Sequence, residues 1–120
     1  MQRTERNLPR YGQVWLVDLN PVTGSEIGGR RPGLVVSRNE SNQYSATVTV
    51  LPITSRPAKR RYPDEVTLPE GIAGLSRQSR LKANMVRTIS KMKLVRLIGT
   101  LPDDYHTEVN KALKIHLNMR

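Results

Sequence analysis

The chain has 120 residues, which is the length of one ordinary domain with a single hydrophobic core. It carries 20 Lys and Arg residues against 10 Asp and Glu residues, and the resulting formal charge of +10 is spread over both halves. This balance favours a polyanionic partner, with nucleic acid first. An acidic protein segment or an anionic membrane surface also fits the charge, although no window shows the apolar helix face that interfacial binding requires.

The sequence contains no cysteine, which excludes disulfides, thiolate metal sites and a cysteine nucleophile. It has no HExxH motif, no Walker loop and no cluster of carboxylates, so we expect neither a metal nor another cofactor. It also lacks a secretory signal and any run of about 18 apolar residues. We therefore expect a cytoplasmic protein with a loosely ordered basic arm over residues 1–10 and a single domain over residues 11–120.

Short strand-like segments occupy the first hundred positions. Alternating or continuous apolar residues predict strands over residues 13–19, 31–37, 46–53, 65–68, 80–89 and 96–101, with Gly, Pro and Asn between them. Apolar spacings of three and four then predict an amphipathic helix over residues 103–117. His116 falls on the apolar stripe of this helix and is expected to be structural, whereas His106 is expected to face solvent. The pattern predicts a mainly β fold with α, a small barrel or strongly curved sheet of about six strands with a C-terminal helix.

A glycine-rich loop over residues 24–32 ends in Arg30 and Arg31, immediately before Pro32 and a strand-like stretch. Glycines let backbone approach a ligand closely, and two guanidinium groups can fork onto phosphate oxygens. The loop is equally compatible with a flexible surface turn whose arginines are solvated.

Two further clusters carry hydroxyl and basic groups. Thr54 and Ser55 end one predicted strand, and the basic run over residues 56–61 follows at once. Hydroxyls beside cations suit phosphate binding, but such residues also commonly satisfy turn backbone groups. In the strand predicted over residues 80–89, alternation sends Arg80, Lys82 and Asn84 to one face, which either lines a nucleic-acid groove or faces water.

Five blocks, in order, resemble the toxins of the MazF/PemK/Kid family. They are WLVDLNP at residues 15–21, GSE at 24–26 followed by Gly29, Arg31 and Pro32, LVVS at 34–37, PITS at 52–55 and VRTI at 86–89. The resemblance runs from about residue 11 to residue 117. It implies an SH3-like small barrel that forms a homodimer, cuts single-stranded RNA at short sequences without metal, and is silenced by a cognate acidic antitoxin of the MazE/PemI type.

The resemblance also implies roles for individual residues. Arg31 matches the family's catalytic arginine, Thr54 its hydroxyl partner at the scissile phosphate, and Glu26 a carboxylate proposed in some members as the base that deprotonates the ribose 2′-OH. Expected products are a 2′,3′-cyclic phosphate and a 5′-hydroxyl. The residues expected to bind RNA are Arg30, Ser55, Arg56, Lys59, Arg60, Arg61, Lys82, Asn84 and Arg87.

One departure from the family pattern concerns Asn84, which stands where some members carry a carboxylate. An amide cannot act as a general base, so Asn84 is expected to bind a base edge or a ribose instead. Two other functions remain open at this stage. One is a non-enzymatic toxin resembling CcdB that binds gyrase, and the other is a basic barrel that binds nucleic acid without cutting it.

Overall fold

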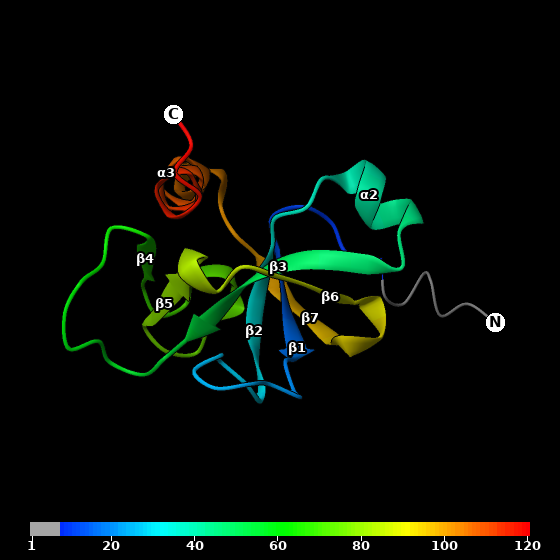
Figure 1. Cartoon of the computed structure of the whole chain (residues 1–120), viewed down its shortest axis with the longest axis horizontal. Coiled ribbons are helices and arrows are strands. Elements are labelled where there is room, and N and C mark those ends of the chain that lie inside the picture. The colour runs from blue at the N-terminus through cyan, green and yellow to red at the C-terminus, as the bar shows by residue number, and fades with distance from the viewer. Residues whose placement is uncertain (1–7) are drawn as a thin grey trace.

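The computed structural model describes residues 8–120, so most of the arm expected over residues 1–10 lies outside the described residues. Within this part of the chain, seven strands form one antiparallel sheet (Figure 1). They are β1 (Gln13–Asp18), β2 (Arg30–Val35), β3 (Thr47–Thr54), β4 (Glu65–Leu68), β5 (Ser79–Lys82), β6 (Arg87–Ser90) and β7 (Leu94–Thr100). The order is β4-β5-β3-β2-β1-β7, and β6 pairs with β3 beside that path. The mainly β prediction is confirmed, with seven strands in place of about six.

The long strand β3 shapes the sheet because two short strands share one of its edges. Its first half pairs with β6, and its end pairs with β5, where Thr54 lies opposite Arg80. The 3-10 turn Ala83–Met85 separates β5 from β6. The prediction of one strand over residues 80–89 is wrong here. β6 pairs with β3 three residues out of step with the pairing of β5, and the turn between the two strands contains these three extra residues. Asn84 consequently leaves the strand face that it was expected to share with Arg80 and Lys82.

A short helix that apolar periodicity does not predict, α2 (Asn39–Tyr44), connects β2 to β3. Its sequence is polar, but Asn42 is fully buried. The side-chain amide of Asn42 donates to the carbonyl oxygen of Ser37 at 2.8 Å and accepts from the hydroxyl of the same residue. Local side-chain hydrogen bonds, rather than an apolar face, therefore stabilise this helix.

The C-terminal helix α3 (His106–His116) follows a 3-10 turn at Asp103–Tyr105, which confirms the helix expected over residues 103–117. Val109 and Ala112 are buried, and the helix packs against β4 and the turn at Ala83–Met85. It lies beside β4 and β5, away from β1 and β7 (Figure 1). No helix of residues 8–120 is long and apolar enough to cross a bilayer.

The two histidines of α3 have environments opposite to those expected. His116 is exposed, and its Nδ1 lies 3.3 Å from Oδ2 of Asp64. His106 is half-buried and meets the ring of Tyr11 edge-on, with the ring centroids 5.2 Å apart. Ile115 is also exposed, so the core ends before the last turn of the helix and leaves His116 outside it.

Alternate residues of the central strands supply two buried clusters. Leu51 and Ile53 of β3 belong to the cluster that contains the buried residues of α3, whereas Val48 and Val50 belong to the other. This period-two pattern fixes which face each side chain of β3 occupies up to Thr54 at its end.

Candidate nucleic-acid interface

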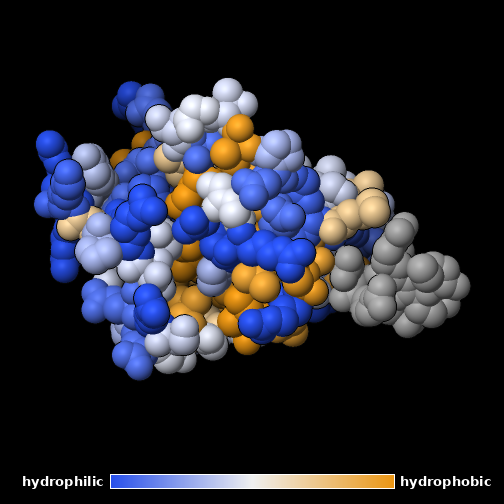
Figure 2. All heavy atoms as spheres, turned by 90° about the horizontal axis from the view of Figure 1, so that it is seen from below, coloured by the Kyte–Doolittle hydropathy of each residue, from blue (hydrophilic) through white to orange (hydrophobic). Residues whose placement is uncertain are grey.

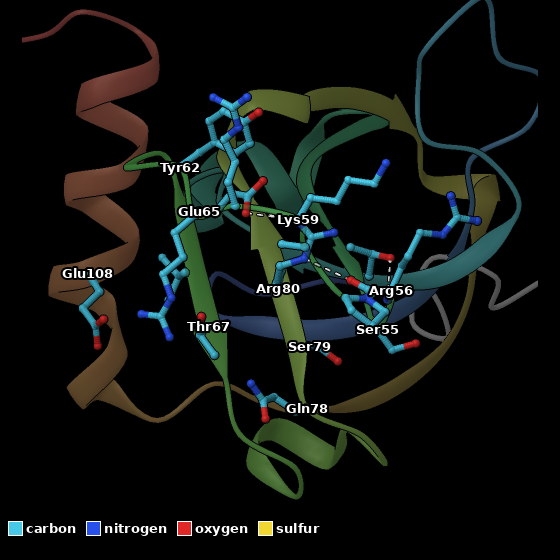
Figure 3. Close-up of a pocket in the computed structure, with 16 residues that line it drawn as sticks. Ser55, Arg56, Lys59, Tyr62, Glu65, Thr67, Gln78, Ser79, Arg80 and Glu108 are labelled. Carbon is cyan, nitrogen blue, oxygen red and sulfur yellow. Dashed lines mark hydrogen bonds and ion pairs between the residues drawn. The ribbon is translucent and has the colours of Figure 1, made fainter.

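Two neighbouring cavities open where β2, β3 and β5 begin or end. The first has a volume of about 740 Å³ and lies between residues 55–62, β4 and β5 (Figure 3). The second, of about 600 Å³, is lined by residues of β1, β2 and β7, by the end of β3 and by residues 74–77 and 79. Ser55 and Ser79 line both cavities, so the two share a wall. Thr54 borders the first cavity and Arg31 the second, which brings these two candidates to either side of that wall.

Polar residues are concentrated at this end of the molecule. Seen from below, hydrophilic side chains crowd the end that carries the connection between β3 and β4 (Figure 2). Apolar side chains show through in the middle of the same view, where the sheet is less covered (Figure 2). That connection carries Arg56, Lys59, Arg60 and Arg61, which line the first cavity, so a ligand that enters this cavity meets cationic side chains.

The glycine-rich loop holds Arg31 through its backbone. Arg31 is half-buried, and its Nε donates to the carbonyl oxygen of Gly28 at 2.8 Å. A Cβ on Gly28 would lie 2.9 Å from Oδ1 of Asn20, and that oxygen accepts from the amide of Gly29 at 3.0 Å. Gly29 has φ +79°, which favours glycine. Within residues 8–120 the terminal guanidinium nitrogens of Arg31 have no hydrogen-bond partner, so they are available to a phosphate oxygen.

The pairing of β2 with β3 explains how Arg31 and Thr54 come together. Gly33 lies opposite Pro52, Leu34 opposite Leu51 and Val35 opposite Val50. The pairing ends at Gly33 and Pro52; extended by two more residues, the same register would set Arg31 across from Thr54. The two residues belong to blocks more than 20 positions apart in the sequence, and antiparallel pairing removes that separation.

Thr54 sits at the end of β3 with 7% of its surface exposed. Its Oγ1 accepts a hydrogen bond from the backbone N–H of Arg56 at 3.2 Å. Because the oxygen acts as the acceptor in that bond, the hydroxyl hydrogen remains free to be donated. Thr54 can therefore donate a hydrogen bond to a phosphate oxygen placed at the shared wall.

A buried carboxylate organises the floor of the first cavity. Oε1 of Glu65 lies 3.1 Å from Nη1 of Arg80, and Oε2 lies 3.1 Å from Nζ of Lys82. The Glu65 side chain is 6% exposed, while those of Arg80 and Lys82 are 19% and 16% exposed. Lys82, expected to bind RNA, is thus already paired with an anion. Glu65 is shared with Arg80, so it offsets one of the two positive charges and the three side chains together keep a net charge of +1.

The basic segment over residues 56–61 forms the outer wall of the first cavity. Arg56, Lys59, Arg60 and Arg61 all line it and are all exposed. The guanidinium carbon of Arg60 lies 5.8 Å from the centre of the Tyr62 ring, a cation–π contact. In the part of the chain that the structure describes, the side chains of Lys59 and Arg61 make no hydrogen bond or ion pair. These cations are free to meet a polyanion.

Asn84 and Arg87, like Lys82, do not line either cavity. Nη1 of Arg87 donates to the carbonyl oxygen of Leu19 at 3.0 Å and so secures the end of β1. Oδ1 of Asn84 is buried and has no hydrogen-bond partner among the described residues. An unsatisfied buried acceptor costs free energy, which makes Asn84 a position that would gain from a ligand donor.

Glu26 and Arg30 lie on the loop side of the site. Arg30 is exposed and lines the second cavity beside Arg31. Glu26 is exposed, lines neither cavity, and its Oε1 accepts from the backbone N–H of Thr23 at 3.2 Å. Arg30, Arg31 and Ser55 therefore share the second cavity, Thr54 borders the first cavity beside Ser55, and Glu26 lies outside both.

Several residues that line the cavities were not among the predicted site residues, namely Tyr62, Glu65, Thr67, Ser76, Arg77, Gln78, Ser79, Arg80, Arg96 and Glu108. The sequence identifies Arg80 as part of a basic strand, but it does not show that Arg80 forms an ion pair with Glu65. That pair becomes visible only from the pairing of β4 with β5, in which Glu65 lies across from Lys82. In residues 8–120 no three His, Cys, Asp or Glu side chains gather as metal ligands would.

Comparison with known proteins matches nearly the whole chain to one family. The family model of the PemK-like, MazF-like toxin of type II toxin–antitoxin systems matches residues 10–117. The chain is 36% identical over 115 residues to endoribonuclease MazF9 of Mycobacterium tuberculosis, covering 92% of this chain and 97% of that protein. The crystal structure of MazF from Deinococcus radiodurans superimposes with a TM-score of 0.81 at 32% identity, over 93% of this chain and 98% of the other. A mycobacterial endoribonuclease in complex with its cognate antitoxin has a TM-score of 0.77 at 26% identity, over 93% and 97% of the two chains.

Proposed function

Because the chain belongs to the family of PemK-like, MazF-like toxins of type II toxin–antitoxin systems, we propose that it is a metal-independent, sequence-specific endoribonuclease acting on single-stranded RNA. The observation that carries the proposal is the placement of Arg31 and Thr54 on adjacent strand ends, beside a wall of free cations. A guanidinium with open donors and a free hydroxyl hydrogen are the groups that stabilise extra negative charge on phosphorus.

In the proposed reaction the ribose 2′-oxygen attacks the adjacent phosphorus, and the bond to the 5′-oxygen of the next nucleotide breaks. The departing 5′-oxygen takes a proton from water, so the products are a 2′,3′-cyclic phosphate and a 5′-hydroxyl. Arg31 stabilises the charge that develops on the phosphoryl oxygens, and Thr54 donates a hydrogen bond to one of them. Glu26 takes the 2′-OH proton in this proposal, which requires its carboxylate to leave the Thr23 amide.

RNA binding is assigned to the cations and polar groups around the two cavities. Arg30, Ser55, Arg56, Lys59, Arg60 and Arg61 meet the backbone, and Asn84 and Arg87 contact the chain further along the sheet. Lys82 contributes to the local field through its pair with Glu65 rather than as a free cation. DNA should bind through the same phosphate contacts and remain uncut, because it has no 2′-OH.

The proposed partners follow from charge and from the relatives. A mycobacterial relative has been solved in complex with its cognate antitoxin. On grounds of charge, we expect a cognate acidic antitoxin of this chain to lie across the basic wall and compete with RNA for it. We propose a homodimer in the cytoplasm, with two separate candidate contact surfaces. One is β7, where Val95 and Leu97 are exposed apolar residues, and the other is α3, where Ile115 is exposed.

The test is incubation of the purified protein with a long RNA, and with a DNA of the same sequence, in excess chelator. Primer extension locates the cuts, and end analysis identifies the cyclic phosphate. We expect cuts at one short sequence in RNA and none in DNA. Intact RNA bound with a steep salt dependence would support a non-catalytic basic barrel instead. Intact, unbound RNA together with gyrase inhibition would support a CcdB-like toxin.

A further inference from the structure

Arg80 occupies a central position in the first cavity and is bonded on both sides. Its Nη1 lies 3.1 Å from Oε1 of Glu65, and its Nε donates to the carbonyl oxygen of Arg56 at 3.1 Å. Figure 3 shows Arg80 rising from β5 between the strand that carries Glu65 and the turn that carries Arg56. The guanidinium therefore links a buried carboxylate to the backbone of the basic segment.

The same turn holds the hydroxyl of Thr54. The Arg56 backbone N–H donates to Oγ1 of Thr54, while the Arg56 carbonyl accepts from Arg80. Thr54 also lies directly opposite Arg80 in the pairing of β3 with β5. Residue 56 is thus fixed at both its amide and its carbonyl, and its amide in turn fixes the orientation of the Thr54 hydroxyl.

We propose that Arg80, held by Glu65, is a positioning residue that orients the Thr54 hydroxyl toward the phosphate. The proposal rests on the proposed function, since it assigns Thr54 a place at the scissile group. Arg80 acts through the Arg56 peptide, and its Nη1 is held by the carboxylate of Glu65, which Lys82 shares. Arginine suits this task because its rigid fork directs Nε and Nη1 at two separate acceptors, which one lysine ammonium cannot reproduce.

The alternative is that Arg80 binds an RNA phosphate directly. Its side chain is 19% exposed and lines the cavity, so the alternative is physically reasonable. The two cases differ in which kinetic quantity the residue controls. A positioning residue affects the chemical step through Thr54, whereas a phosphate ligand affects RNA affinity and its salt dependence.

The kinetic experiment is a double-mutant cycle with Arg80→Lys and Thr54→Val, measuring kcat and KM on a short RNA that contains the cut sequence. We expect Arg80→Lys to lower kcat about tenfold with little change in KM. In the Thr54→Val background the same substitution should have almost no further effect. Arg38→Lys is the matched control, since Arg38 is exposed at α2 and its Nε bonds only Ser41 within the described residues. A raised KM with unchanged kcat, or effects of the two changes that simply multiply, would overturn the proposal.

A second measurement needs no cleavage activity. The amide resonance of Arg56 in a ¹H–¹⁵N spectrum reports its bond to Thr54 Oγ1. The chemical shift of this resonance should change in Arg80→Lys and in Glu65→Gln, and it should stay unchanged in Arg38→Lys. An unmoved Arg56 resonance in both variants would refute the positioning role even if the protein proves inactive on RNA. Failure of the wild-type protein to cut RNA would count against the proposed function alone.

Discussion

The two loops that border the candidate site are fixed by different means. Residues 20–29 are held by their own backbone and by Asn20, and Arg31 is bonded to a carbonyl only three residues away. Residues 55–62 depend instead on Arg80 and Glu65, which lie 24 and nine positions from Arg56. One loop is organised locally, and the other by side chains that the sheet brings together.

The difference affects what each loop can tolerate. A locally organised loop keeps its geometry as long as its glycines and its polar cap remain. A loop fixed through a buried ion pair depends on the whole set of partners, and removal of one partner leaves another charge uncompensated. We expect substitutions in the first loop to act on chemistry, and substitutions under the second loop to act on stability as well.

The largest expected effect is on Arg31. Arg31→Ala removes the guanidinium that stabilises the reacting phosphate, and kcat should fall by about 10²–10³-fold. Unfolding midpoints should stay close to the wild-type value, because the residue bonds only one loop carbonyl. Rates of RNA cleavage and thermal melting check the two parts of the prediction.

Arg30→Ala gives the matched comparison within the same loop. Arg30 is exposed beside Arg31 and should contribute to affinity, so its loss should raise KM and leave kcat nearly unchanged. If the two alanine variants behaved alike, the separate roles of the paired arginines would be wrong.

The first loop was accessible to sequence reasoning because its information is local. Gly28, Gly29, Arg31 and Pro32 lie next to one another, and the turn chemistry of glycine and proline is specific. The residues around Thr54 left a phosphate-binding role and a turn role both open, and the family resemblance supplied its expected place at the scissile phosphate. The proximity of Thr54 to Arg31 followed once β2 and β3 were paired in antiparallel register.

The Glu65 network was not predictable in the same way. Whether Glu65 faces Lys82 depends on the register of β4 against β5, and the sequence leaves that register open until the turn at Ala83–Met85 is known. The same turn explains why Asn84 was misplaced. The polar helix α2 was not predicted, because its buried residue is the polar Asn42, held by side-chain hydrogen bonds. Its sequence therefore lacks the apolar residues at helical spacing by which a helix is predicted.

The second largest effect is expected at Glu65. Glu65→Ala leaves Arg80 and Lys82 without their anion and should lower the free energy of unfolding by about 2 kcal/mol. This is less than the cost of breaking a fully buried ion pair, because both cations are partly exposed to water. Urea denaturation followed by tryptophan fluorescence measures this. Glu70→Ala is the control at an exposed carboxylate and should stay within about 0.5 kcal/mol. If Glu65→Ala and Glu70→Ala had equal free energies of unfolding, the conclusion that a buried ion pair organises the loop over residues 55–62 would be wrong.

Gly28→Ala tests the locally organised loop. The new Cβ would approach Oδ1 of Asn20 to 2.9 Å and Cγ1 and Cγ2 of Val22 to 3.1 Å. Both neighbours are side chains that can move, so the cost should be about 1 kcal/mol, mainly through the broken bond between Asn20 and Gly29. Since the Gly28 carbonyl orients Arg31, kcat should fall by about tenfold while KM stays near its original value. A change in KM alone would show that this loop binds RNA without orienting the catalytic group.

The smallest effect concerns the free cations of the second loop. Lys59→Ala should weaken RNA binding only modestly, because the attraction between one exposed ammonium and a flexible single strand is screened by salt. The sharper signal is the dependence of log affinity on log salt, whose slope should become shallower by about 0.7 for each phosphate that the variant no longer neutralises. Lys82→Ala is the comparison, because Lys82 is already paired with Glu65 and releases few counterions on binding. A slope that changes equally in both variants would mean that RNA displaces Glu65 from Lys82, and the second loop would then rearrange on binding while the first stays fixed.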